Sequence, residues 1–260
     1  QLSYDNRLWL LNNWWDVNKL YGYDTKNDQL TDYGPNFVNE DQAILTPRHL
    51  YCAEEDKKGN IWLGTTIGPF YLSKSNVLNN TAEFVQHKVP RNDGTNYADY
   101  LLAGVEVRSM AVDEGNRKWM GTTDYGIYVI SDDCNTQIYH FNTENSPLPS
   151  NTINDILIMP NGLIYIATDK GLCSYQSDIS QNNKEMTKDN VYAYPNPVKP
   201  DYTGNIKIVG LTPNADVKIV SSNGSLVNQG TSTGNVYSWD GYDLKGKKVA
   251  SGIYMVEAAT

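Results

Sequence analysis

The chain has 260 residues and a formal net charge of −9, and hydrophobic residues make up 40% of it. This balance supports a packed core and excludes a wholly disordered chain. No apolar run approaches the roughly 20 residues that a membrane-spanning helix needs. Because the charge is acidic and the lysines and arginines do not cluster, nucleic acid is excluded as a partner. Abundant tyrosine and tryptophan among many turn formers favour short strands joined by tight turns, and so predict an all-β fold.

The chain opens on Gln1 without a basic region or a small-residue cleavage site, so we expect a mature product or an excised piece of a longer protein. A degraded copy of a repeat follows at 6–12. The turn after this copy is lengthened and contains Trp14, Trp15 and Asp16. Tryptophan faces beside Asn and Asp suit sugar rings, which makes these three residues candidate ligand contacts. The alternative is that the two tryptophans cover a neighbouring repeat.

Three clearer copies of the repeat follow, at residues 59–68, 116–126 and 161–171. The four copies carry a core aromatic at Trp9, Trp62, Trp119 and Tyr165, spaced 53, 57 and 46 residues apart. Periods in this range are those of β-propeller blades. In each copy, strands alternate with turns rich in Asn and Gly, which predicts a four-stranded meander. We expect the four aromatic residues to be structural wedges between neighbouring blades.

An insert at 91–100 separates the second copy from the third and contains Tyr97 and Tyr100. Inserts on one face of a propeller often form a binding rim, so both tyrosines are candidate ligand contacts. The alternative is a tolerated surface loop.

No pattern in the chain marks a catalytic or metal site. GxSxG, HExxH, CxxC and P-loop motifs are absent from the sequence, and His87 and His140 are expected at surface or packing positions. We therefore predict no catalytic residues, no metal, no cofactor and no enzymatic activity. A carboxylate pair assembled by folding, as in propeller hydrolases or lyases, stays open. Asp240 and Asp243 could hold calcium, although Asx-turns are favoured for them.

The chain has three cysteines, Cys52, Cys134 and Cys173. An odd number would leave one thiol unpaired in an oxidising compartment. Cys52 and Cys173 lie in strand-like runs, where a small buried hydrophobe is expected.

The sequence changes character after the fourth copy. Residues 177–190 are polar without period-two alternation and predict a linker. From residue 191 to 260, some seven short alternating segments predict a small immunoglobulin-like β-sandwich. The predicted organisation is therefore propeller blades at 1–176, a linker at 177–190 and a sandwich at 191–260.

The sequence motif of the copies resembles the "two-component regulator propeller" repeat of Bacteroidetes envelope proteins. The motif consists of GNIWLGT with a later glycine, and of NSPLPSNTI before the next copy. Such propellers usually have seven blades. Four copies, the first of them incomplete, therefore imply a partial propeller from a larger protein.

The C-terminal region carries two further resemblances. Its ending, WDGYDLKGKKVASGIY, resembles the immunoglobulin-like domain of flagellar hook-capping proteins, and its opening, YPNPV, resembles the sorting domains of type IX secretion. Together with the repeats, they resemble the end of a surface propeller protein of that system. The resemblance implies an exported binding and assembly protein in the periplasm, outer membrane or cell surface. Its implied partners are other envelope proteins or a surface glycan such as anionic lipopolysaccharide.

Two rival functions remain. One is the extracellular oligosaccharide-sensing domain of a hybrid two-component regulator, and the other is a propeller hydrolase or lyase. The YPNPV domain stands where a sensor carries a tyrosine-rich sandwich, which favours the assembly role. A net charge of −9 fits an anionic glycolipid only through a local basic patch or a bridging cation, and the sequence shows no such patch.

Overall fold

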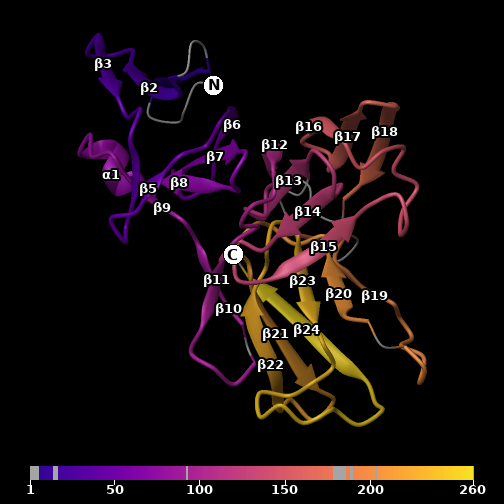
Figure 1. Cartoon of the computed structure of the whole chain (residues 1–260). Coiled ribbons are helices and arrows are strands. Elements are labelled where there is room, and N and C mark those ends of the chain that lie inside the picture. The colour runs from indigo at the N-terminus through magenta and orange to yellow at the C-terminus, as the bar shows by residue number, and fades with distance from the viewer. Residues whose placement is uncertain are drawn as a thin grey trace. The chain divides into compact units, whose positions relative to one another are not determined.

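The computed structural model describes residues 6–13, 17–91, 93–177, 186–187, 190–202 and 204–259. These residues form strands and turns with one short helix, α1 (Lys74–Leu78), so the predicted all-β class is confirmed (Figure 1). The chain divides into two compact units, one of residues 1–158 and 164–175 and the other of residues 159–163 and 176–260. Most of the predicted linker lies outside the described residues. No helix in the described ranges has the length and apolarity needed to cross a bilayer.

The first unit contains four propeller-like blades in chain order, and each is an antiparallel meander. The first blade comprises β1 (Arg7–Asn12), β2 (Lys19–Asp24) and β3 (Gln29–Asp32). The second comprises β6 (Leu50–Glu55), β7 (Ile61–Thr65), β8 (Phe70–Leu72) and β9 (Glu83–Val85). The third comprises β12 (Val107–Val112), β13 (Lys118–Thr122), β14 (Ile127–Ile130) and β15 (Gln137–Phe141). The fourth comprises β16 (Ile153–Ile158), β17 (Leu163–Thr168) and β18 (Gly171–Gln176).

The uniform four-stranded repeat is found in the third blade alone. The first and fourth blades have three strands each within the described residues, and the second has six. Its additional strands are β4 (Phe37–Asn39) and β5 (Ile44–Leu45), and β4 pairs in parallel with β9. Local periodicity in the sequence does not predict these additional strands. After the first blade, the chain pairs β4 with β9 at the outer edge of the second blade, and this pairing is long-range.

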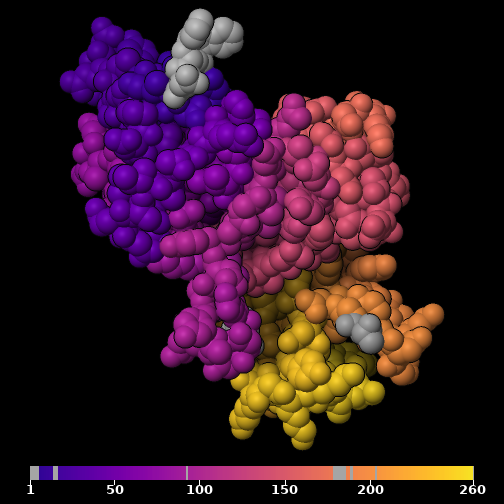
Figure 2. Space-filling view, viewed as in Figure 1, coloured from indigo at the N-terminus to yellow at the C-terminus, as the bar shows by residue number. Residues whose placement is uncertain are grey.

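The Trp-x-Gly-Thr part of the repeat explains how consecutive blades pack. A Cβ on Gly64 would lie 2.6 Å from the carbonyl oxygen of Val107, which belongs to the next blade. A Cβ on Gly121 would lie 2.5 Å from Cγ2 of Ile153, again in the next blade. Real Cβ atoms do not come that close, so glycine at this position allows the first strand of the following blade to approach. In Figure 2 the third and fourth blades lie in contact on the face shown.

The threonine of the same motif closes the turn between the second and third strands. The hydroxyl of Thr65 donates to Gly68 O at 2.6 Å, and Thr122 and Thr168 donate to Gly126 O and Gly171 O at 2.8 Å each. We call the end of the blades that carries these turns the Thr-turn end. The opposite end, with the turns at 56–60, 113–117 and 159–162, is the Asp-turn end.

The first strands of the second, third and fourth blades share a β-bulge. The register of β6 on β7, β12 on β13 and β16 on β17 shifts after Leu50, Val107 and Ile153, respectively. The extra residue lies at the Thr-turn end in each case. These extra residues are Tyr51, Arg108 and Asn154. A bulge changes the direction of a side chain and is common beside functional sites.

The second unit contains two three-stranded antiparallel sheets. One comprises β19 (Tyr192–Tyr194), β20 (Ile206–Val209) and β23 (Val236–Trp239). The other comprises β22 (Leu226–Thr231), β21 (Asp216–Ser221) and β24 (Tyr254–Ala259). Buried residues of both sheets, including Ile208, Ile219 and Trp239, share one core. Alternation of apolar and polar residues in β21 places one face of that strand in this core.

Candidate functional site

The loop with adjacent tryptophans was the first predicted ligand site. Trp14, Trp15 and Asp16 lie outside the described residues. The side chain of Asn13, before them, accepts from Leu50 N at 2.9 Å and also donates to Leu50 O. The side chain of Asn18, after them, donates to Pro47 O at 2.6 Å. Both flanks of the loop are therefore held against 47–50, at the Thr-turn end of the second blade.

The predicted binding insert is a hairpin of β10 (Lys88–Pro90) and β11 (Ala98–Tyr100). It stands out from the sheets of its own unit as a magenta lobe in Figure 2. The two candidate tyrosines have different environments. Tyr97 is 68% exposed, and its ring lies 5.9 Å from the guanidinium carbon of Arg91. The Tyr100 hydroxyl donates to Asp41 at 3.0 Å, which raises the pKa of Tyr100 and fixes the base of the hairpin.

Three of the four repeat aromatics are buried in clusters that include residues of the following blade. Trp9 packs with residues of the second blade, and Trp62 packs with residues of the third. Trp119 lies 6.2 Å from the Phe141 ring of its own blade and 5.8 Å from the Tyr175 ring of the next.

Tyr165 departs from this pattern, because it is 37% exposed. No blade follows the fourth copy among the described residues, so its place as a wedge stays a prediction. Six residues before Trp62 and Trp119 stand Asp56 and Asp113, and each carboxylate accepts a 3.0 Å hydrogen bond from the indole Nε1. Six residues before Tyr165 stands Met159, which offers no carboxylate. In the fourth copy, both the aspartate and its hydrogen-bonded tryptophan are therefore replaced, by Met159 and Tyr165.

The Asp-turn end holds a polar network that the sequence did not reveal. Lys118 and Asp56 are each 1% exposed, and their charged atoms lie 3.5 Å apart across the interface between the second and third blades. Lys118 also donates to Asp132 O at 3.1 Å. Burial acts to raise the pKa of Asp56, but hydrogen bonds from Trp62 and Asn60 outweigh it and hold that pKa below the usual value.

The surrounding lysines of the Asp-turn end are also paired. Lys57 lies 2.8 Å from Glu114, and Lys58 lies 2.9 Å from Asp132. Each of these contacts joins the second blade to the third. These ion pairs form a structural fastening between the second and third blades at the Asp-turn end.

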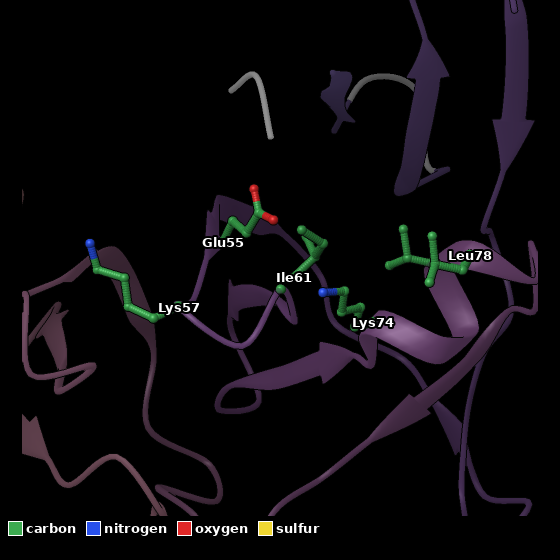
Figure 3. Close-up of a pocket in the computed structure, with 7 residues that line it drawn as sticks. Glu55, Lys57, Ile61, Lys74 and Leu78 are labelled. Atoms are coloured by element: carbon green, nitrogen blue, oxygen red, sulfur yellow. The ribbon is translucent and has the colours of Figure 1, made fainter. Parts of the chain in front are cut away.

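A shallow cavity of about 190 Å³ lies beside this fastening (Figure 3). Ile61, Val77 and Leu78 provide its apolar surface, and Glu55 and Lys74 provide charge. The aliphatic part of Lys74 approaches Gly59 closely. The cavity combines charges of both signs over an apolar floor, and we assign no ligand to it.

The remaining predicted residues have structural roles. Asp240 accepts from Tyr242 N at 3.0 Å, and Asp243 accepts from Lys245 N and Lys247 N at 2.9 Å each, which are the favoured Asx-turn bonds. No metal-binding cluster occurs among the residues that the structure describes. His140 stacks on Tyr128 with ring centroids 4.0 Å apart. The three cysteines are free thiols.

The chain was compared with protein-family models, curated proteins and solved structures. No family model matches the chain, and no curated protein matches it. Among solved structures, PorZ, described as an essential bacterial surface component of the type IX secretion system of Porphyromonas gingivalis, is 29% identical with a TM-score of 0.74. The match covers 99% of this chain and 36% of PorZ. The resemblance to type IX propeller proteins that the sequence motifs predicted is confirmed.

Two further solved structures are more distant. They are extracellular domains of two hybrid two-component systems from B. thetaiotaomicron, at 22% and 18% identity with TM-scores of 0.48 and 0.45. The first match covers 92% of this chain and 28% of that protein, and the second covers 80% and 26%. The chain thus spans about a third of the solved proteins that it matches.

Proposed function

We propose that the chain is part of a non-enzymatic, PorZ-like assembly protein of a type IX secretion system, which acts in cargo attachment at the bacterial surface. The observation that carries this proposal is the match to PorZ over 99% of the chain, which includes both the blades and the two-sheet unit. In this proposal, residues 1–176 are propeller blades and residues 191–260 are an immunoglobulin-like sorting domain.

The test is deletion of the parent gene in its native organism, followed by complementation. We expect type IX cargo to accumulate in the periplasm and surface-attached cargo to fall, with recovery on complementation. If cargo export and attachment are unchanged while transcripts of a glycan-utilisation locus lose induction, the assembly role is wrong and the sensor alternative holds.

Glycan binding is the finer part of the proposal. Its candidate contacts are Trp14, Trp15 and Asp16 in the loop and Tyr97 and Tyr100 on the hairpin. The 68% exposure of Tyr97 supports a stacking role, whereas Tyr100 is engaged with Asp41.

The glycan test compares Trp14→Ala, Trp15→Ala and Tyr97→Ala with the unmodified chain on an array of envelope glycans. Tyr71→Phe, a change at a half-buried core residue, is the control. Loss of signal in any of the three alanine variants, but not in the control, is the expected result. Unchanged binding in all three removes these residues from the site.

A further inference from the structure

The two arginines at the Thr-turn end differ from the other arginines of the chain. The chain has five: Arg7, Arg48, Arg91, Arg108 and Arg117. Arg7 is buried and donates to Val77 O at 2.9 Å, Arg91 pairs with Asp99, and Arg117 pairs with Asp113. Arg48 and Arg108 are exposed, and neither guanidinium group has a hydrogen bond or ion pair with a described residue.

Both arginines lie beside Tyr51, where two blades adjoin. Arg108 is the bulged residue of β12 and Tyr51 is the bulged residue of β6, and the close approach of Val107 to Gly64 brings these two strands together. Arg48 precedes Tyr51 by three residues, and its backbone nitrogen donates to the Thr66 hydroxyl at 2.8 Å.

Tyr51 is the residue on which both arginines act electrostatically. Burial and the adjacent Glu106 carboxylate raise the pKa of Tyr51, and the charges of Arg108 and Arg48 act in the opposite direction. The ring of His49 lies 5.8 Å from that of Tyr51.

Glu106 is already engaged. Its Oε2 accepts from the Tyr51 hydroxyl at 3.4 Å and from the Thr123 hydroxyl at 3.1 Å. These bonds hold the carboxylate within its own blade junction and orient the tyrosine. Arg48 and Arg108 are exposed, and we call Arg48, Tyr51, Glu106 and Arg108 the arginine cluster.

We propose that the arginine cluster binds a carboxylate group of a ligand at the Thr-turn end of the second and third blades. A guanidinium group presents its donors as a planar fork that matches a carboxylate. The cluster has two positive charges and one negative charge, so a single carboxylate neutralises it. A phosphate dianion carries one negative charge more than the cluster can neutralise, which disfavours it.

The aromatic rings of Tyr51 and His49 beside the arginines favour a carboxylate carried on a sugar ring, that is, a uronic acid. This step deepens the glycan-binding part of the proposed function and rests on it. The cluster also supplies the local basic patch that was not visible in the sequence, because Arg48 and Arg108 are 60 residues apart along the chain.

The test is titration calorimetry of the full 260-residue chain with four probes: digalacturonate, a neutral digalactoside, acetate and inorganic phosphate. We expect digalacturonate to bind, acetate to bind more weakly, and the digalactoside and phosphate not to bind at the same concentrations. Arg48→Gln and Arg108→Gln should each weaken digalacturonate binding by at least tenfold.

Lys26→Gln is the control, because it removes one exposed positive charge from the turn between β2 and β3, outside both the arginine cluster and the hairpin, and should leave binding unchanged. Thermal unfolding of each variant checks that the fold is intact, which the exposure of both cluster arginines supports. The proposal is overturned if digalacturonate does not bind, if phosphate binds better, or if the cluster variants bind like the original chain. Equal loss in the Lys26→Gln variant also overturns it. The secretion phenotype of the deletion strain is a separate readout, so failure here leaves the assembly role standing.

Discussion

At the scale of single residues, the buried pair of Lys118 and Asp56 distinguishes one blade interface from the others. The positions equivalent to Lys118 in the second and fourth copies are Ile61 and Ile164, both buried. An apolar residue therefore fits this place in the repeat. The lysine needs the carboxylate of Asp56, because a buried charge without a partner is strongly destabilising.

This contrast predicts an asymmetric double-mutant cycle. Asp56→Asn should lower the free energy of unfolding by roughly 3–5 kcal/mol, because it leaves Lys118 buried without a counter-charge. Lys118→Ile should cost less, and adding it to Asp56→Asn should recover most of the loss. Urea unfolding measures all three variants. Equal costs for both single changes, with no recovery in the double variant, would contradict the pairing.

The lowered pKa of Asp56 adds a pH dependence. A carboxylate with a depressed folded-state pKa contributes stability above its unfolded value near 4, and this contribution is lost as the pH falls through the folded value. The acid-induced loss of stability below about pH 4 should therefore be smaller in Asp56→Asn/Lys118→Ile than in the unmodified chain. The comparison requires urea titrations at pH 7 and at pH 3.5. A loss of the same size in both proteins would exclude Asp56 as a contributor.

The three thiols should differ in reactivity. Burial raises the pKa of Cys52 to about 12 and that of Cys134 to about 11, and it also raises the pKa of the half-buried Cys173. Because the thiolate is the reactive form, we expect iodoacetamide at pH 8 to modify Cys173 first in the folded protein. Cys52 and Cys134 should react only after unfolding. Peptide mass spectrometry over time gives the order, and early modification of Cys52 would contradict its raised pKa.

At the scale of elements, the motif glycines determine how closely blades pack. In the fourth copy Ala167 stands where Gly64 and Gly121 stand in the second and third. Gly121→Ala should lower the free energy of unfolding by about 1–3 kcal/mol, because the new Cβ meets Ile153 and Ser109. Ala167→Gly is the control, with an expected cost of about 1 kcal/mol or less. Chemical denaturation measures both variants, provided that the free energy of unfolding depends on denaturant concentration with the same slope in each. An unchanged denaturation midpoint for Gly121→Ala would contradict the close packing of the third and fourth blades at this glycine.

The local elements of the repeat could be predicted from sequence, whereas its long-range pairings could not. Strands β7 and β13 lie between the Asn- and Gly-rich turns of the second and third copies, where the predicted meander requires a strand. Their alternation and flanking turn residues are local signals. The parallel pairing of β4 with β9 joins segments some 45 residues apart and leaves no such signal.

The candidate sites also divide into those with a local sequence signal and those that depend on long-range contacts. The hairpin tyrosines could be found because the insert breaks the repeat, but the engagement of Tyr100 by Asp41 needed the fold. The arginine cluster was missed because its residues come from two blades, and two of them, Tyr51 and Arg108, stand in bulges. The shared register of these bulges is visible only in the paired strands.

At the scale of the whole molecule, the second unit should fold by itself. Its core contains residues of both sheets, and Trp239 is the single tryptophan from residue 186 to the end. The Trp239 indole donates to Tyr242 O at 2.8 Å and its ring lies 5.4 Å from that of Tyr254. A fragment of residues 186–260 should therefore show one cooperative urea transition in tryptophan fluorescence. Emission typical of a solvated indole without urea would mean that the unit needs the rest of the chain.

The Lys118–Asp56 pair has a further consequence for a chain built from similar repeats. Such repeats share nearly the same apolar faces, so a nascent chain risks stacking them out of sequence. If the third copy packed on the fourth, the ammonium group of Lys118 would face Met159, which stands where Asp56 stands in the second copy. The buried charge would then have no counter-charge, which destabilises this wrong arrangement. A lysine in place of an isoleucine thus favours the packing of the third copy on the second over its packing on the fourth.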